Sequence, residues 1–384
     1  MAVVVVVAVA MGAAPAGAAV TPQDSNRYLS AFDGRNGTLL WSAPPVREPT
    51  AAIVVAAGAG IVVTQQYACR DSEGLPRHHV IAYDAKSGHV KWNLTPRGIA
   101  LVMSTIPNQM VVLVDSLGLR GVNAATGKTR WRVRAGTARW NPATDALLVA
   151  GDPGSRVAGP VLISRRSPAG SALQALDPRT GMRLWLHRAP AGADLEVIGQ
   201  APDAVIIREG PSGPAPVMPA SVSALKPSDG TARVTVHAAA SLNAGAVLAG
   251  STLMVWSVDP VTNDVTTTGY DTKTTRMRWT RTDLDSVVAV PGGQLALGRA
   301  PQLTLVGLDP VTGVDAWRAT DVDGILWPTS RVVVTSGAAR VDVRTGAVER
   351  FAQPLQLGTR PELDHTWAFD GTRIFAGTAC PELD

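Results

Sequence analysis

The sequence has few charged residues, few aromatic residues and only two cysteines in 384 residues. Charged side chains make up 17% of the chain and hydrophobic residues 46%, so the chain can bury a large core. Helical periodicity is not sustained anywhere, which argues against a helical protein. The net charge of +4 comes without a run of like charges, and we therefore expect no nucleic acid among the partners.

Motifs of catalytic and metal sites are missing as well. There is no G-x-S-x-G sequence, and no His-x-His or Glu-x-x-His spacing that would supply a zinc site. The carboxylates that alternate in Asp283–Asp285 and Asp321–Asp323 lack the further ligands of a calcium loop, and turn chemistry explains them. We therefore expect no catalytic residue, no cofactor and no metal ligand.

A nine-residue phrase recurs along almost the whole sequence. Its model copy is Asp177–Trp185, DPRTGMRLW. The copies that keep its frame are Asp33–Trp41, Asp84–Trp92, Asn123–Trp131 and Asp309–Trp317. The less complete copies are Lys226–Val234 without Asp and Trp, Asp271–Trp279 without Gly, and Asp342–Arg350 without Trp. The mean step is about 44 residues, as expected for four-stranded propeller blades.

Each phrase is typical of the turn and second strand of a β-hairpin. The Asp side chain can accept hydrogen bonds from the turn amides, and the Gly four positions later can take a positive φ. A Trp at a fixed place fills the wedge between stacked sheets. By strand alternation it should share a face with the residue two before it, as Trp92 with Val90. The residues with these structural roles are Asp33, Gly37, Trp41, Asp84, Gly88, Trp92, Gly127, Trp131, Asp177, Gly181, Trp185, Trp279, Asp309, Gly313 and Trp317.

The repeats predict an all-β protein, a single β-propeller of eight four-stranded blades, with seven blades as the alternative. Apolar pairs between the phrases supply the inner strands of each blade. The first blade would combine a hairpin near residues 28–42 with strands near 367–377, which closes the ring without an open edge. We expect residues 21–384 to form this one domain.

The repeat resembles that of the pyrroloquinoline-quinone (PQQ) type propellers, whose units carry A-x-D-x-x-T-G-x-x-x-W. The match is close in Ala82–Trp92 and Ala175–Trp185, and the resemblance covers nearly everything after residue 27. The family includes quinoprotein dehydrogenases and, without any cofactor, the propeller lipoprotein of the outer-membrane β-barrel assembly machinery. The resemblance therefore implies a fold and leaves the chemistry open.

Two classes of function follow from this resemblance. Quinoprotein dehydrogenases carry a pair of adjacent cysteines over the quinone, and this sequence has no adjacent cysteines. We therefore expect the non-enzymatic branch: a monomeric, non-catalytic binding platform in the cell envelope, whose partner is an unidentified envelope protein or an anionic polymer. The alternative is a quinoprotein-type dehydrogenase, or a ligand sensor that uses the central funnel.

Residues 1–20 are expected to be a secretory signal peptide or a membrane anchor. Met1–Gln23 contains no charged side chain, and an apolar run leads into Ala16–Ala18, which has the A-x-A form of a cleavage site. The apolar stretch also approaches the roughly 20 residues that span a bilayer. Either interpretation places the rest of the chain outside the cytoplasmic membrane.

The two cysteines, Cys69 and Cys380, are predicted to form a disulfide. Each follows the second inner strand of its expected blade, and the two blades are neighbours at the ring closure. An even number of cysteines in an exported chain fits a bridge.

Basic residues accumulate beside the Trp of the expected outer strands. Lys or Arg on an exposed edge strand deters edge-to-edge pairing, which explains them structurally. The alternative is a basic rim that holds the protein near anionic polymers or lipid head groups. These residues are Lys91, Arg130, Arg132, Arg134, Arg183, Arg188, Arg276, Arg278, Arg281 and Arg318.

Overall fold

The computed structural model contains strands and turns, and the residues that it describes include no helix. The described residues are 29–35, 38–43, 50–68, 79–96, 101–105, 110–115, 117–135, 145–148, 159–167, 170–201, 203–211, 218–240, 245–259, 261–284, 286–290, 296–300, 304–322, 325–328, 331–335, 339–351, 365–369 and 373–378. The prediction of an all-β protein is confirmed.

The described strands pair antiparallel in eight four-stranded sheets, which we number by their first strand along the chain. Sheet 1 holds β1 (Leu29–Asp33), β2 (Leu39–Ala43), β31 (His365–Phe369) and β32 (Arg373–Thr378). Sheet 2 holds β3 (Thr50–Gly58), β4 (Ile61–Ala68), β5 (His79–Asp84) and β6 (Val90–Leu94). Sheet 3 holds β7 (Leu101–Thr105), β8 (Met110–Asp115), β9 (Gly118–Asn123) and β10 (Thr129–Arg134). Sheet 4 holds β11 (Asp145–Leu148), β12 (Val161–Ser167), β13 (Gly170–Leu176) and β14 (Arg183–Arg188).

The remaining sheets follow the same order along the chain. Sheet 5 holds β15 (Ala193–Ala201), β16 (Ala204–Pro211), β17 (Met218–Leu225) and β18 (Ala232–Ala240). Sheet 6 holds β19 (Gly245–Ala249), β20 (Thr252–Val258), β21 (Val265–Asp271) and β22 (Met277–Arg281). Sheet 7 holds β23 (Ser286–Ala289), β24 (Ala296–Ala300), β25 (Thr304–Leu308) and β26 (Asp315–Ala319). Sheet 8 holds β27 (Ile325–Pro328), β28 (Val332–Thr335), β29 (Ala339–Asp342) and β30 (Val348–Arg350).

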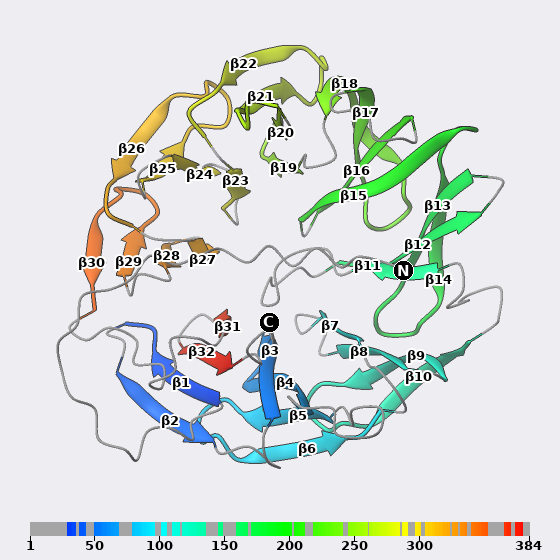
Figure 1. Ribbon diagram of the computed structural model, residues 1–384, viewed down its shortest axis with the longest axis vertical. Helices are drawn as coiled ribbons and strands as arrows, with labels where there is room; N and C mark the ends of the chain where they lie inside the picture. The colour runs from blue at the N-terminus through cyan, green and yellow to red at the C-terminus, as the bar shows by residue number, and fades with distance from the viewer. Residues whose placement is uncertain are drawn as a thin grey trace.

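The sheets stand around a common centre (Figure 1). Nearest to the centre lie β3, β7, β15, β19, β23, β27 and β31. At the perimeter lie β2, β6, β10, β18, β22, β26 and β30. Sheet 1 joins the two ends of the chain, because β1 pairs with β32 from Leu29 opposite Gly377 to Asp33 opposite Arg373.

The core lies in layers between successive sheets. In β8, Val111 and Leu113 pack with residues of sheet 2, whereas Val112 packs with residues of sheet 4. All three side chains are fully buried. A strand covered on both faces has apolar residues in succession rather than in alternation, which is why these segments contain short apolar runs.

The repeated Asp holds the hairpin turn between the third and fourth strands of its sheet. In sheet 2, Asp84 Oδ1 accepts hydrogen bonds from the backbone N–H groups of Lys86 and Ser87, both at 3.0 Å. The N–H of Gly88 donates to the Asp84 carbonyl at 2.8 Å, and Gly88 has φ +73°. A short polar side chain therefore fixes a turn whose fifth residue lies in the left-handed region.

Each repeat Trp contacts the turn of the following sheet. Its indole N–H donates to the carbonyl of the residue that follows the first position of the next phrase. The pairs are Trp41 to Ala85 (3.1 Å), Trp92 to Ala124 (2.7 Å), Trp131 to Pro178 (2.8 Å), Trp185 to Pro227 (2.8 Å), Trp279 to Pro310 (2.9 Å) and Trp317 to Val343 (2.8 Å). We call this contact the tryptophan dock.

The strand alternation expected before the Trp is interrupted. In sheet 2, Trp92 lies opposite Ala82 and Val90 lies opposite Tyr83, so Lys91 is an extra residue in β6. Such a bulge breaks the two-residue period, and Val90 is 52% exposed whereas Trp92 is 8% exposed. The residue opposite the Trp is small in each such sheet, for example Ala82 in sheet 2 and Gly121 in sheet 3.

We expect Gly181→Ala to destabilise the protein more than Gly192→Ala. Both glycines have positive φ, +67° and +77°, so both substitutions carry a similar backbone cost. A Cβ on Gly181 would lie 2.6 Å from the Trp131 ring, whereas a Cβ on Gly192 would meet nothing within 4 Å. Overpacking typically costs about 1–3 kcal/mol, and we expect a difference of this size.

The measurement is urea unfolding of the two variants and the parent chain. Equal unfolding free energies for the two variants would show that the dock tolerates a Cβ and would contradict this account.

Candidate interaction surface

The repeat residues predicted from the sequence occupy turns and sheet contacts in the described part of the chain. The carboxylates of Asp33, Asp84, Asp177 and Asp309 each accept hydrogen bonds from backbone N–H groups two or three residues later. Gly88, Gly127, Gly181 and Gly313 have φ between +67° and +73°. Gly37, Cys69 and Cys380 lie outside the described residues, so the disulfide stays a prediction.

These turn hydrogen bonds stabilise the charged form of the carboxylates. The backbone N–H of Ser87 lowers the pKa of Asp84 below its usual value, and the side chain of Arg35 lowers the pKa of Asp33. The backbone N–H of Thr274 and the Arg278 guanidinium lower the pKa of Asp271. The three carboxylates are therefore ionised hydrogen-bond acceptors, which suits a turn and not a general acid.

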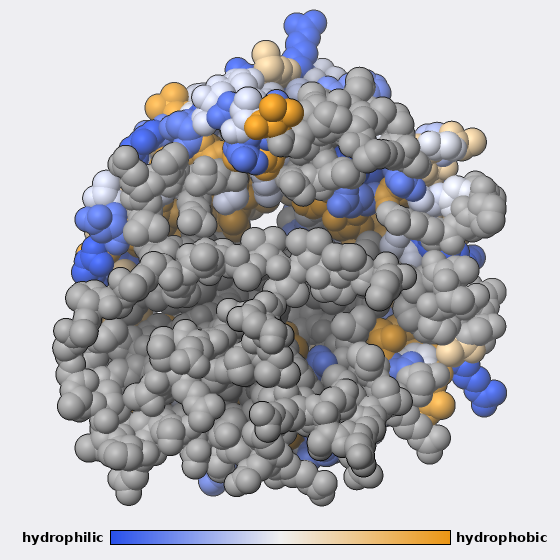
Figure 2. All heavy atoms as spheres, viewed as in Figure 1, coloured by the Kyte–Doolittle hydropathy of each residue, from blue (hydrophilic) through white to orange (hydrophobic). Residues whose placement is uncertain are grey.

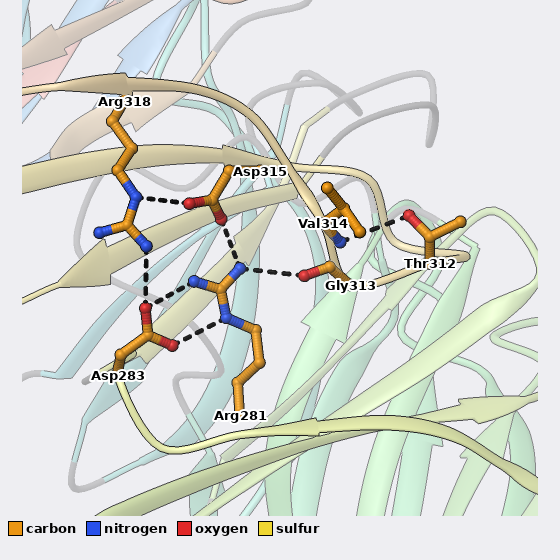
Figure 3. Close-up of polar contacts among 7 residues, drawn as sticks. All are labelled: Arg281, Asp283, Thr312, Gly313, Val314, Asp315 and Arg318. Carbon is orange, nitrogen blue, oxygen red and sulfur yellow. Dashed lines mark hydrogen bonds and ion pairs between the residues drawn. The ribbon is translucent and has the colours of Figure 1, made fainter.

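A network of two arginines and two aspartates joins sheets 6 and 7 (Figure 3). Arg281 of β22 contacts Asp283 at 2.6 Å, and it also pairs with Asp315 of β26. Its Nη1 donates to the carbonyl of Gly313 at 2.9 Å, in the turn that receives Trp279. Arg318 of β26 pairs with Asp315 and lies 2.9 Å from Asp283, so each arginine bridges both aspartates.

The network is partly buried and electrostatically satisfied. The Arg281 side chain is 14% exposed, and its hydrogen bonds to Asp283 and Asp315 raise its pKa above the usual range. The same guanidinium lowers the pKa of Asp283 to about 2. We therefore interpret the network as a structural link between two outer strands, because every charge in it already has a partner within the chain.

A second polar seam joins sheets 4 and 5. His187 Nε2 lies 3.0 Å from Glu209 Oε1, and Ser171 Oγ donates to Asp194 Oδ1 at 3.0 Å. Serine, histidine and carboxylate thus occur together, but the serine is bonded to one carboxylate and the histidine to another. A catalytic triad requires the histidine between them, so this seam has the geometry of an interblade contact.

Sequence reasoning missed both groups because the pairs that join the sheets lie 22 to 35 residues apart in the chain. A local signal was available at the position two after the repeat Trp. That position is apolar in other sheets, as in Val133 and Ala319, and polar at His187 and Arg281.

The basic residues of the outer strands fall into two groups. Four of them form ion pairs with aspartates of their own or the next sheet: Lys91, Arg278, Arg281 and Arg318. By contrast, the side chains of some others are exposed and make no hydrogen bond or ion pair within the described residues: Arg130, Arg132, Arg183, Arg188 and Arg276. Figure 2 shows hydrophilic side chains projecting from the perimeter, including the lower right, where Figure 1 places β9 and β10.

The described residues contain neither a cluster of metal ligands nor a membrane-spanning helix. No three His, Cys, Asp or Glu side chains among them lie close enough together to hold a metal ion. None of these residues forms a helix long and apolar enough to cross a bilayer.

Comparison with known proteins identifies the class. The family model described as outer membrane protein assembly factor BamB matches residues 25–215. No curated protein matches the chain significantly in sequence. Four-stranded antiparallel sheets around a common centre define a β-propeller. With its repeat and this match, the chain belongs to the PQQ-repeat β-propeller family, as the resemblance implied.

Solved structures are similar in fold at low sequence identity. Sqt1 of Saccharomyces cerevisiae is 11% identical with a TM-score of 0.50, and the alignment covers 94% of this chain and 100% of that one. BamB of Moraxella catarrhalis is 14% identical with a TM-score of 0.45, covering 84% of this chain and 90% of that one. The computationally designed Ika8 protein is 14% identical with a TM-score of 0.47, covering 86% and 98%.

We expect Asp283 to contribute to stability in a pH-dependent way. Its pKa falls from 3.8 to about 2 on folding, so the contribution is complete above about pH 4 and is lost as the pH falls through about 2. Because the side chain is 45% exposed and screened, we expect about 1 kcal/mol or less. The difference in unfolding free energy between the parent and Asp283→Asn should therefore shrink between about pH 4 and 2.

The control is Asp264→Asn, which changes an exposed carboxylate that makes no side-chain hydrogen bond or ion pair within the described residues. Urea titrations at several pH values provide the measurement. A parent-minus-variant difference for Asp283→Asn that does not change with pH would refute the ion-pair interpretation.

Proposed function

We propose that the protein is a non-catalytic, extracytoplasmic β-propeller that acts as a binding platform in the cell envelope. The observation that carries this proposal is that the side chains of the repeat residues are used in building the fold. Their Asp carboxylates hold turns, and their Trp rings join sheets. What varies between sheets lies on the outer strands, where some charges are paired and others are exposed.

The platform we propose is a closed ring of eight blades. Two observations support closure: β1 pairs with β32 along the whole of β1, and β3 packs beside both β31 and β32. The less complete copies of the repeat also contribute strands to four-stranded sheets, Lys226–Val234 in sheet 5 and Asp342–Arg350 in sheet 8. The pairing of β1 with β32 also satisfies backbone groups that two separate hairpins would leave exposed at their edges.

Two observations support a location outside the cytoplasmic membrane. The first 23 residues carry no charge and contain an apolar run, although they lie outside the described residues. The family model that matches residues 25–215 describes an outer membrane protein assembly factor.

Deletion of residues 365–384 tests the closure. The deletion removes β31 and β32, so β1 keeps only β2 as a partner. We expect loss of cooperative thermal unfolding, because a two-stranded remnant is at best marginally stable. The matched control deletes 381–384 and keeps both strands and Cys380. A shortened chain that unfolds like the parent would exclude the closed ring.

Two measurements test the platform function. A full-length chain with a C-terminal tag should be digested by protease added to intact spheroplasts, and protection until lysis would rule out the extracytoplasmic location. Purified protein should also show neither thermal stabilisation nor dye reduction with alcohols when PQQ and Ca²⁺ are added. Turnover together with stabilisation would favour the quinoprotein alternative.

A further inference from the structure

The outer strand of sheet 3 carries exposed arginines, two of which have no counterion among the described residues. Strand β10 alternates buried Trp131 and Val133 with exposed Arg130 and Arg132. Residues 116–144 contain no Asp or Glu and six Lys or Arg. The arginine side chains at 130 and 132, and that of Lys128 in the preceding turn, make no hydrogen bond or ion pair within the described residues.

One residue of the repeat explains the missing counterion. In two other sheets the first residue of the phrase pairs with the cation seven residues later: Asp84 with Lys91 at 3.4 Å, and Asp271 with Arg278. In sheet 3 the same positions are Asn123 and Arg130. Asn123 Oδ1 still accepts a hydrogen bond from the N–H of Thr126 at 3.0 Å, so the amide keeps the turn and removes the charge.

The turn that receives Trp131 carries a cation of sheet 4. The indole of Trp131 donates to the carbonyl of Pro178 at 2.8 Å, and the next residue is the exposed Arg179. The Arg179 side chain also makes no hydrogen bond or ion pair within the described residues. Arg179 belongs to the turn of sheet 4, on the side of sheet 3 that Trp131 faces, and is a separate cation. Lys128, Arg130 and Arg132 lie on β10 or in the turn before it, and we call these three residues the β10 basic surface.

A partly buried arginine next to this surface is incompletely satisfied. Arg120 lies directly opposite Arg132 in the β9–β10 pair, and like charges in such positions repel. Arg120 is 3.4 Å from Asp115 Oδ2, too long for a strong charge-assisted hydrogen bond. Its buried Nε and Nη2 atoms have no hydrogen-bond partner within the described residues. An anion at Arg132 would relieve this repulsion.

We infer that the β10 basic surface binds a linear phosphate polymer of the cell envelope, such as a polyol phosphate. Guanidinium forks match phosphate oxygens, and the tetrahedral group can accept from arginines that approach from two directions. Arg130 and Arg132 supply two exposed guanidinium groups on one strand. The inference deepens the platform proposal and rests on it for the presence of the polymer.

The observations favour a polymer over other occupants. A peptide strand would have to pair with the edge of β10, which has a register shift between Thr129 and Trp131, and bulges hinder such pairing. Single-stranded nucleic acid is bound by base stacking on exposed aromatic rings, and Trp131 is only 9% exposed.

The test measures binding of the purified full-length chain to fluorescently labelled poly(glycerol phosphate) at several salt concentrations. We expect Arg130→Gln combined with Arg132→Gln to weaken binding about tenfold or more and to reduce its salt dependence. Asn123→Asp should weaken binding about threefold or more, because it supplies the carboxylate that pairs with the cation in sheets 2 and 6.

The matched control combines Arg276→Gln with Arg344→Gln, which removes the same charge from exposed positions in sheets 6 and 8. An equal loss in this control would show diffuse attraction and overturn the assignment of the surface. Equal affinity for poly-L-glutamate, or for a single-stranded oligonucleotide, would overturn the assignment of the polymer.

The experiments distinguish failure of the proposed polymer site from failure of the proposed platform function. A folded chain that reaches the cell exterior and does not bind the polymer disproves only the site. A chain retained in the cytoplasm disproves the platform whatever its affinity in solution.

Discussion

The tryptophan dock is the interaction on which the rest of this structure depends. One side chain supplies a large apolar face and one N–H donor, and both are satisfied by the turn of the next sheet. Trp131, for example, packs on Gly181 and donates to Pro178. Because the ring packs on the fifth residue of the turn, that residue is a glycine in each dock. An Asp or Asn at the first position holds the turn amides, except in the turn that receives Trp185, which begins with Lys226. The recurring phrase thus contains both halves of the contact, the ring for the next sheet and the turn for the previous one.

The interruption of the repeat follows from the same constraint. Sheet 5 has Val234 where six of the other sheets have Trp, and the turn that follows in sheet 6 has Thr275 where the other phrases have Gly. Thr275 has φ +59°, so the turn keeps its shape at the cost of backbone strain. Elsewhere a Cβ at this position would lie 2.6 to 2.8 Å from an indole ring, and here there is no ring to exclude it. Between sheets 5 and 6 the missing Trp and the missing Gly thus occur together. Sheet 8 also lacks the Trp, at Arg350, but the phrase of sheet 1 keeps Gly37.

This relation explains how much the sequence could predict. The hairpins, their turn residues and the blade-sized step were accessible, because each lies within one contiguous phrase. The acceptor of each indole N–H could not be predicted, because the donor and the acceptor lie far apart in the chain, as Trp185 and Pro227 do at 42 residues. The same holds for Arg281 and Asp315, 34 residues apart, whose pairing depends on the angle between neighbouring sheets. The bulge before Trp92 was also missed, because simple alternation has no place for an extra residue.

The charges of the outer strands can vary because the dock does not use them. In β10 the buried side chains of Trp131 and Val133 face the next sheet, while Arg130 and Arg132 are free to differ from sheet to sheet. The first residue of the phrase is less free, since its side chain accepts turn hydrogen bonds in every copy except that of Lys226. Asn is the smallest change from Asp that preserves an acceptor. Asn123 keeps that acceptor and leaves Arg130 without a counterion. A single substitution in the repeat can thus remove the counterion of an outer-strand arginine without altering the fold. The residues that build the propeller are therefore different from those that give one outer strand its binding property.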